Sequence, residues 1–378
     1  MQGDFHYYAT YCAAVLAGYT HDESLSVCHA AQLVDHCSRS FLKKVGGPDA
    51  AATTQLQLEL MDARTDRLGL CDITRIWASF HFLPRDLYAP VKKGSKNYKD
   101  KYRLICGPNG DLLVETVTLA KDRGLAAAGI AMHVLADTWA HTYFAGTPSL
   151  VINNTGYHFY ELMPQEGGGF ARRRVAFSHN PSAKEDPEKG VYVGSVYQST
   201  ENSIMNLGHG RAGHLPDYSY IRYAYLPAWG GYREIIKDNP SDYEHAFAQM
   251  VYALHWLRDG KEAFAADTYA EDVIEPHLDT IRGIIDRRQT DASDDWRTFG
   301  ERLTGDKIPD FDMDAHVAEY RNAGSMSKPD TFLGTFFDAA HRQKSMVTTR
   351  IMASGSRLAG IPPRKMTKST VHAVEIND

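Results

Sequence analysis

Apolar positions recur at helical spacing over most of the chain, which predicts a mainly helical protein. Residues 7–18 are typical of a first helix that ends at Gly18, and Thr20 with Glu23 predicts a capping box that opens a second helix through about residue 38. Further helices are expected at about 50–68, 241–258, 268–288, 312–322 and 330–354. The C-terminal helices are therefore assigned to about 241–354.

The segment 110–146 carries the strongest helical pattern, and it predicts either one long helix or one helix interrupted near Gly124 or Gly129. Beyond it Gly, Pro and Asn become more frequent, and the stretch at about 164–192 is typical of a long loop or hairpin insertion. The chain has no internal repeat and no clear domain boundary. We therefore expect one domain over 1–361, followed by a polar tail over 362–378.

Composition supports a folded protein and limits the classes of function. With 378 residues, of which 43% are apolar, the chain can bury at least one large core. The formal net charge of −6 argues against the global positive field on which non-specific nucleic-acid binding depends. The N-terminus lacks the pattern of a secretion signal and no 18 apolar residues run together, so we expect a soluble protein made in the cytoplasm, with signal-independent export left open. The five cysteines include no CxxC pair, which favours reduced, buried thiols.

His133, Asp137 and His141 recur every four residues within AMHVLADTWAHTYFAG. On a helix this spacing advances only about 40° per step, so the three side chains project from one face. Imidazole and carboxylate are zinc ligands, and this row could serve two neighbouring ions with the aspartate between them. The alternative is a histidine that is hydrogen-bonded within the core, and the spacing also arises by chance.

Other histidines and acids could complete such a site, although each, taken singly, is more often a helix cap or a solvated side chain. They are Asp4 and His6 near the chain start, Asp35 late in the second helix, His81 in FHFLP, His158 and Glu161 in GYHFYEL, and His209, His214 and Asp217 in LGHGRAGHLPD.

The order and spacing of these residues resemble a superfamily that comprises the zinc-dependent phospholipases C, the fungal and plant zinc nucleases and the fungal heterokaryon-incompatibility proteins. Its most specific parts here are HFLP and HVLADTWAH, the latter similar to the HxxxDxxAH form of the heterokaryon-incompatibility branch. The stretches DFHYYATY and GHGRAGHLPD also resemble an uncharacterised bacterial family. The resemblance covers about residues 1–220 and implies a mainly α, multi-helix phospholipase C or zinc nuclease-like core there.

The resemblance also implies two or three zinc ions and a ligand set for each. One ion would be held by Asp35, His81, His133 and Asp137, a second by His6 and Asp137 with or without Asp4, and a third by His141 and Asp217 with His209 or His214. His158 and Glu161 remain alternatives for completing the third set. Asp35 or Asp4 would orient the attacking water as general base.

Two departures from the superfamily pattern affect these assignments. Its phospholipases C use the amino group of a mature N-terminal Trp as a ligand, and no such Trp exists here, so we expect Asp4 to substitute for it. The alternative is that the free amino group of this chain is itself the ligand. They also place the last helical His six residues beyond the Asp, with a Pro between, whereas His141 follows Asp137 by four. The third ion is the one that the pattern supports least.

The resemblance implies a phospholipase C-like phosphodiester hydrolase. The alternatives are a zinc nuclease acting on single-stranded nucleic acid, a non-catalytic metal-binding protein of the same fold, and a structural protein with buried histidines. We expect Tyr218, Tyr220 and Arg173 to contact substrate, although such runs are more often core packing or solvated loop. A lysine-rich loop could also gather an anionic group, through Lys92, Lys93, Lys96, Lys99 and Lys101. Phospholipid and nucleic acid both remain open as substrates, and the oligomeric state is open.

Overall fold

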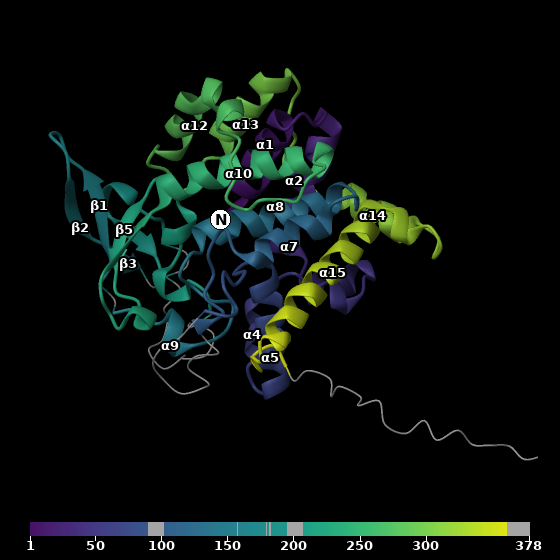
Figure 1. Cartoon of the computed structure of the whole chain (residues 1–378), viewed down its shortest axis with the longest axis horizontal. Coiled ribbons are helices and arrows are strands. Elements are labelled where there is room, and N and C mark those ends of the chain that lie inside the picture. Colours follow the sequence, from purple (N-terminus) through teal and green to yellow (C-terminus); the bar gives the residue numbers. More distant parts are fainter. Residues whose placement is uncertain (90–101, 157, 179, 181–182, 195–206, 361–378) are drawn as a thin grey trace, which may run out of the picture.

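The computed structural model describes the chain except residues 90–101, 157, 179, 181–182, 195–206 and 361–378. Helices dominate the described residues and a small sheet lies at one end, which confirms the expected mainly α class (Figure 1). The polar tail expected at 362–378 lies outside the described residues. Within the described part of the chain, no helix combines the length and apolarity needed to cross a bilayer.

Along the chain, one set of α-helices precedes the strands and a second set follows them. The first set is α1 (Thr10–Leu16), α2 (His21–His36), α3 (Arg39–Val45), α4 (Gln57–Ala63), α5 (Arg67–Phe80), α7 (Asp111–Ala120), α8 (Leu125–Ala140) and α9 (Leu150–Asn153). The second set is α10 (Asn239–Asp259), α11 (Glu271–Ile274), α12 (Leu278–Ile285), α13 (Ser293–Thr304), α14 (Asp314–Asn322) and α15 (Phe332–Ala353).

The start of α2 forms as its sequence predicts. Thr20 Oγ1 accepts a hydrogen bond from Glu23 N, and Glu23 Oε2 accepts one from Thr20 N, which completes the capping box. The first helix differs from the expectation, because a π-helical turn, η1 (Asp4–Ala9), precedes α1. The helix expected at 50–68 is also wrong in extent, since only α4 and the first residues of α5 are α-helical there.

The helical pattern over 110–146 forms two helices, as the interrupted alternative predicts. Helix α7 ends at Ala120 and α8 follows Gly124, whose φ of +86° lies in the left-handed region that favours glycine. Gly129 lies instead within α8, where a Cβ atom would lie only 2.3 Å from Val27 O of α2. Gly124 therefore separates α7 from α8, and Gly129 lets α8 pack closely against α2.

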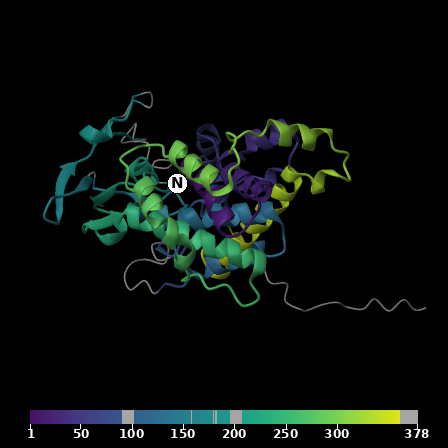
Figure 2. The same cartoon turned by 90° about the horizontal axis from the view of Figure 1, so that it is seen from above.

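Helix α8 lies at the centre of the molecule. All of its residues from 126 to 138 are buried, and it contacts α2, α5, α7, α10 and α15. In Figure 1 it runs between α2 and α10 on one side and α7 and α15 on the other. Figure 2 shows the strands at one end of this helical body and α15 toward the other. Because polar groups on α8 are enclosed, they require partners from the surrounding elements.

The expected insertion contains strands. Strands β1 (Tyr160–Pro164) and β2 (Phe170–Arg174) form an antiparallel hairpin with Glu161 opposite Arg173. Strand β1 also pairs with β5 (Arg222–Tyr225), and β5 pairs with β6 (Ile235–Asp238), so the antiparallel order is β2-β1-β5-β6. Strands β3 (Ala176–Ser178) and β4 (Val191–Val193) form a parallel pair. The sheet thus extends beyond the boundaries predicted at 164–192.

Candidate metal centre

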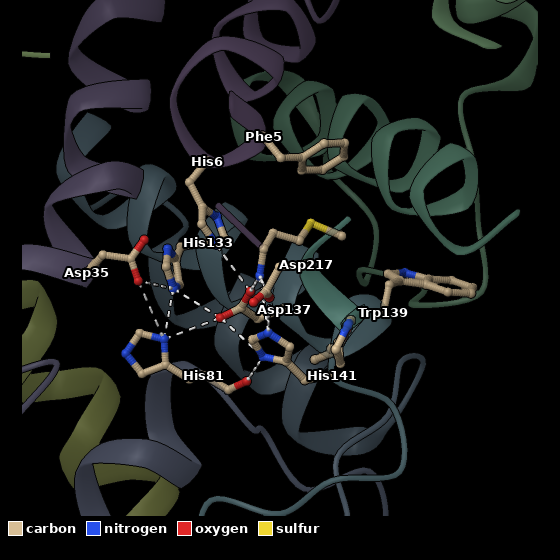
Figure 3. A network of polar contacts seen from close by, with 12 residues as sticks. Phe5, His6, Asp35, His81, His133, Asp137, Trp139, His141 and Asp217 are labelled. Atoms are coloured by element: carbon tan, nitrogen blue, oxygen red, sulfur yellow. Dashed lines mark hydrogen bonds and ion pairs between the residues drawn. The ribbon is translucent and has the colours of Figure 1, made fainter. Parts of the chain in front are cut away.

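Helix α8 brings the residues of HVLADTWAH to one place. His133 and Asp137 lie one turn apart and are buried, and His141 is the residue at which the helix ends. Asp137 Oδ2 lies 3.2 Å from His133 Nε2 and 3.6 Å from His141 Nδ1. The four-residue spacing therefore places two imidazoles beside one carboxylate (Figure 3).

The first ligand group comprises His6, His133 and Asp137. The π-helical turn η1 carries His6, whose ring stacks on that of His133 with the centroids 3.8 Å apart. His6 Nε2 faces Asp137 Oδ1 at 3.1 Å. Both ring nitrogens of His6 are buried, and neither makes a hydrogen bond within the described part of the chain. A buried imidazole without hydrogen bonds is costly, and a metal ion would satisfy one of its nitrogens.

The second ligand group comprises Asp35, His81 and His133. Asp35 lies in the last turn of α2 and His81 directly follows α5. His81 Nδ1 lies 3.8 Å from Asp35 Oδ1 and 3.3 Å from both His133 Nε2 and Asp137 Oδ2. The packing of α2 and α5 on α8 brings the ends of these two helices into the same cluster (Figure 3).

The third ligand group comprises His141, His209 and Asp217. Asp217 Oδ1 lies 3.2 Å from His141 Nε2, and Asp217 Oδ2 lies 3.7 Å from His209 Nε2. His209 precedes the 3-10 turn Gly210–Ala212, and Asp217 ends a second one, Leu215–Asp217. The Gly-rich stretch after the strands therefore folds back onto the end of α8.

Backbone carbonyls fix the orientation of four of these imidazoles. His133 Nδ1 pairs with Ala31 O at 2.9 Å, and His81 Nε2 pairs with Thr53 O at 3.1 Å. His141 Nδ1 pairs with His81 O and His209 Nδ1 with Gly213 O, each at 2.7 Å. A ring nitrogen that donates to a carbonyl leaves the other nitrogen unprotonated in the neutral ring, and that nitrogen faces the aspartates. This arrangement is typical of metal-ligating histidines.

The amino group of Met1 also lies within the cluster. It is buried and lies 2.8 Å from Asp137 Oδ1, 3.2 Å from Asp217 Oδ1 and 3.1 Å from His141 Nε2. Burial opposes its charge, but the attraction of Asp137 and Asp217 outweighs burial and raises its pKa to about 11. The sequence left this amine as the alternative to Asp4, and the structure brings the amine rather than the Asp4 carboxylate to the cluster. The absent Trp of the resembling phospholipases was the signal that raised the question.

Three histidines of the cluster are held neutral by burial. Burial lowers the pKa of His6, His133 and His209 to about 4 in each case. Burial opposes the charge of Asp137 and Asp217, yet neighbouring imidazoles and the Met1 amine hold both carboxyl pKa values well below the usual range. Neutral imidazoles and ionised carboxylates are the protonation states that metal binding requires.

Asp4 does not join the cluster, in contrast to its expected roles as ligand and general base. Its Oδ1 accepts a hydrogen bond from Phe5 N at 2.8 Å, and its Oδ2 accepts one from Ala292 N at 3.1 Å. Burial raises the pKa of Asp4 to about 6. The side chain ties η1 to the start of α13 instead, and the Met1 amine occupies the place expected for it.

His214 is not a member of the third ligand group. Its Nδ1 lies 3.0 Å from Asp217 Oδ2, but its side chain is 53% exposed and it supports Asp217 from outside. His158 is exposed. The buried Glu161 pairs with Arg173 and Arg288. Of the alternatives for the third site, the structure therefore brings His209 to His141 and Asp217.

The residues expected to contact substrate have other partners. Arg173 also donates hydrogen bonds to the carbonyls of Glu188 and Pro187. The Tyr218 hydroxyl donates to Glu185, and the Tyr220 hydroxyl pairs with that of Tyr192 at 2.8 Å. These side chains pack and link the strands, which is the more common role of such residues. The lysine loop, Lys92, Lys93, Lys96, Lys99 and Lys101, lies outside the described residues.

The three ligand groups could hold metal ions. Each offers ligand atoms within 4.8 Å of one another, and His133 belongs to two of the groups. The carboxylates of Asp137 and Asp217 share one ammonium, that of Met1, so negative charge is in excess and favours a cation. Imidazole with carboxylate suits zinc and other first-row divalent ions.

Comparison with known proteins places this architecture in a family without assigning it a role. No curated protein and no solved structure matches the chain. Residues 1–351, which include all three ligand groups, match the profile described as "Family of unknown function (DUF6765)". The chain therefore belongs to this family.

Proposed function

We propose that the chain is a metal-dependent phosphodiester hydrolase of phospholipase C type, with zinc as the metal. The observation that carries the proposal is the position of Asp137. Its Oδ1 faces His6 and the Met1 amine, whereas its Oδ2 faces His81 and His133. A carboxylate with one oxygen toward each of two ligand groups suits a bridge between neighbouring ions, as in enzymes that hydrolyse phosphoesters with clustered metals.

The resemblance and the distances support the same assignment of ligands. His81, His133 and Asp35 would hold one ion together with Asp137 Oδ2, and His6 with Asp137 Oδ1 would hold a second. His141, His209 and Asp217 would hold a third. His133 has one nitrogen committed to Ala31 O, so it serves a single ion, and its distance of 3.3 Å to His81 Nδ1 favours the Asp35 group.

The Met1 amine takes the part that the superfamily gives to its N-terminal amine. Its nearest neighbours are Asp137 of the first ligand group and His141 and Asp217 of the third, so it lies between those two groups. The pKa of about 11 describes an ammonium, which has no lone pair to offer. Binding of a metal ion by this amine would therefore release one proton.

Asp35 is best placed to act as general base. Its side chain is 30% exposed, compared with 1% for Asp137 and 5% for Asp217, so a water molecule can reach it. Gln32 Nε2 donates to Asp35 Oδ2 at 3.5 Å and orients the carboxylate, while Oδ1 faces His81. Asp35 would accept the proton of the attacking water. Bound zinc ions would lower the pKa of that water and stabilise the charge that develops on the phosphoryl oxygens.

The experiment is metal analysis followed by a turnover assay with bis(4-nitrophenyl) phosphate. We expect near-stoichiometric zinc, zinc-dependent hydrolysis, and a loss of about a hundredfold or more in kcat for Asp35→Asn with the fold retained. His255→Ala, which removes an exposed histidine of α10, is the matched control and should be silent. Phosphatidylcholine vesicles and a short single-stranded oligonucleotide then distinguish the two substrate classes.

The possible outcomes separate the competing functions. A protein without metal, even after incubation with zinc, would refute every metal-dependent role. A protein with bound zinc that hydrolyses none of the three phosphodiesters would be a metal-binding protein rather than an enzyme. Unchanged turnover in Asp35→Asn would remove Asp35 from the reaction while leaving the metal centre intact.

A further inference from the structure

A cavity of about 780 Å³ opens beside the end of α8 and is separate from the metal centre. None of the residues of the three ligand groups lines it. Its wall includes Tyr143, two residues beyond His141, and Cys106, whose Sγ lies 3.9 Å from Asp137 O. We call it the Trp229 pocket, after the tryptophan that also lines it. Its volume is typical of sites that bind small molecules.

Aromatic rings form one side of the Trp229 pocket. The rings of Tyr143 and Trp229 lie 5.4 Å apart, centroid to centroid, at an interplanar angle of 35°. The hydroxyl of Tyr102, which also lines the pocket, donates to Trp229 O and holds the tryptophan segment in place. The indole Nε1 of Trp229 is buried, and no described residue accepts a hydrogen bond from it. A flat apolar body would find stacking partners here.

Tyr143 is held in an unusual backbone conformation. Its φ of +81° lies in the left-handed region, which residues other than glycine seldom adopt. Tyr143 N donates to Cys106 O at 3.0 Å, and Cys106 N donates to Phe144 O at 2.7 Å. These bonds fix the strained residue at the pocket wall, and strain of this kind is concentrated at ligand sites.

Two arginines give the rim of the pocket a positive charge. Arg85 follows the FHFLP turn and Arg233 precedes β6, so they come from distant parts of the chain. Neither guanidinium makes a hydrogen bond or ion pair with a described residue, whereas Arg172 and Arg222 nearby in the sheet are paired with Glu234 and Asp238. Asp86 also lines the pocket, and its Oδ1 accepts a hydrogen bond from Tyr88 N at 2.8 Å.

We propose that the Trp229 pocket binds an amphipathic organic anion: a flat apolar body that carries one sulfonate, carboxylate or phosphate group. The body would stack on Trp229 and Tyr143, and the anionic group would pair with Arg85 and Arg233. Guanidinium groups suit such oxyanions because their donors match two oxygens at once. The proposal does not depend on the function of the metal centre.

Fluorescence titration with two probes that share an apolar body tests this assignment. The anionic probe is 8-anilinonaphthalene-1-sulfonate, and the neutral one is N-phenyl-1-naphthylamine, which lacks the sulfonate. We expect saturable one-to-one binding of the anion by the folded protein. The double variant Arg85→Gln/Arg233→Gln should lower the affinity for the anionic probe about tenfold or more and change the affinity for the neutral probe by less than about twofold. Trp229→Leu should lower the affinity for both probes. Arg302→Gln, at an exposed arginine of α13, should change neither affinity.

Near-UV circular dichroism of each variant establishes that the fold is intact. Because Arg85 and Arg233 are exposed, the double variant tests the proposal even if Trp229→Leu fails to fold. Equal affinity of the anionic probe for the wild type and the double variant would overturn the proposal. Binding of several probe molecules at once, insensitive to Trp229→Leu, would show a non-specific surface and would overturn it as well.

Discussion

The amino group of Met1 lies 2.8 Å from Asp137 Oδ1, although 136 residues separate them along the chain. This contact joins the chain start to the last turn of the central helix α8, and in the proposed function it supplies the N-terminal amine that the resemblance implies. We therefore predict that an extension left attached ahead of Met1 will reduce bound zinc by about one ion and reduce phosphodiester turnover by tenfold or more. Metal analysis and the turnover assay on tagged and tag-cleaved protein measure both effects.

Asp4→Asn provides the contrasting test at the same end of the chain. Both oxygens of Asp4 accept backbone hydrogen bonds, so we expect the variant to lose about 1 kcal/mol of stability and to retain its zinc. Loss of zinc from Asp4→Asn together with full activity of the extended protein would show that the carboxylate, rather than the amine, reaches the metal.

Asp137→Asn should remove most of the bound metal and lower the free energy of unfolding by about 3 kcal/mol or more. The variant removes the charge that faces the Met1 ammonium and the imidazoles in a buried site. Zinc content and urea unfolding provide the measurements. Asp267→Asn, at an exposed aspartate, is the control and should change neither. Normal zinc content in Asp137→Asn would exclude the bridging role.

Stability of the metal-free protein should be greatest between about pH 6.5 and 8. Burial lowers the pKa of His6, His133 and His209 to about 4, so the unfolded chain binds more protons below about pH 6.5 and stability falls as the pH falls toward 4. Asp4, with its pKa raised to about 6, favours the folded state as the pH falls. The three histidines outweigh this single carboxyl group.

The Met1 amine changes stability with pH in the opposite direction from the histidines. Its pKa is raised from 8.0 to about 11, so its contribution is complete below about pH 8 and is lost as the pH rises through 11. Urea midpoints measured from pH 4 to 11 test the whole profile. A flat profile below pH 6.5 would mean that the histidines are not enclosed as the structure describes.

Gly129→Ala should destabilise the protein and weaken zinc binding together. The added Cβ would lie 2.3 Å from Val27 O, so α2 and α8 must separate, and these helices carry Asp35 and His133. We expect a loss of about 1–3 kcal/mol and a measurable drop in zinc affinity. Gly283→Ala within α12 meets nothing within 4 Å and should be neutral or stabilising. Equal effects of the two substitutions would contradict the close-packing argument.

Helical spacing predicted the part of the site that lies on one element. His133, Asp137 and His141 share a face because the period of the helix requires it. The gathering of His6, Asp35 and His81 depends on how three further segments pack on α8, and only the resemblance indicated it. The choice of His209 over His214 depends on two 3-10 turns whose path is not encoded in any periodic pattern.

The sequence could not indicate two other features. The pairing of β1 with β5 depends on contacts between distant segments, and the imperfect alternation of the tyrosines gave no clear strand signal. The position of Asp4 depends on Ala292, a neighbour far along the chain. Asp4 was therefore assigned by its closeness in sequence to His6, whereas its backbone partners decide where its carboxylate lies.

The four carbonyls that orient the imidazoles belong to Ala31, Thr53, His81 and Gly213. Because every residue type supplies a carbonyl, substitution at Ala31 or Thr53 leaves the acceptor in place as long as the backbone keeps its course. Alanine at Thr53 would therefore leave the orientation of His81 unchanged, even though this position aims a metal ligand. Among divergent members of the family, positions 31 and 53 can thus change identity, and only the path of the chain there has to be inherited.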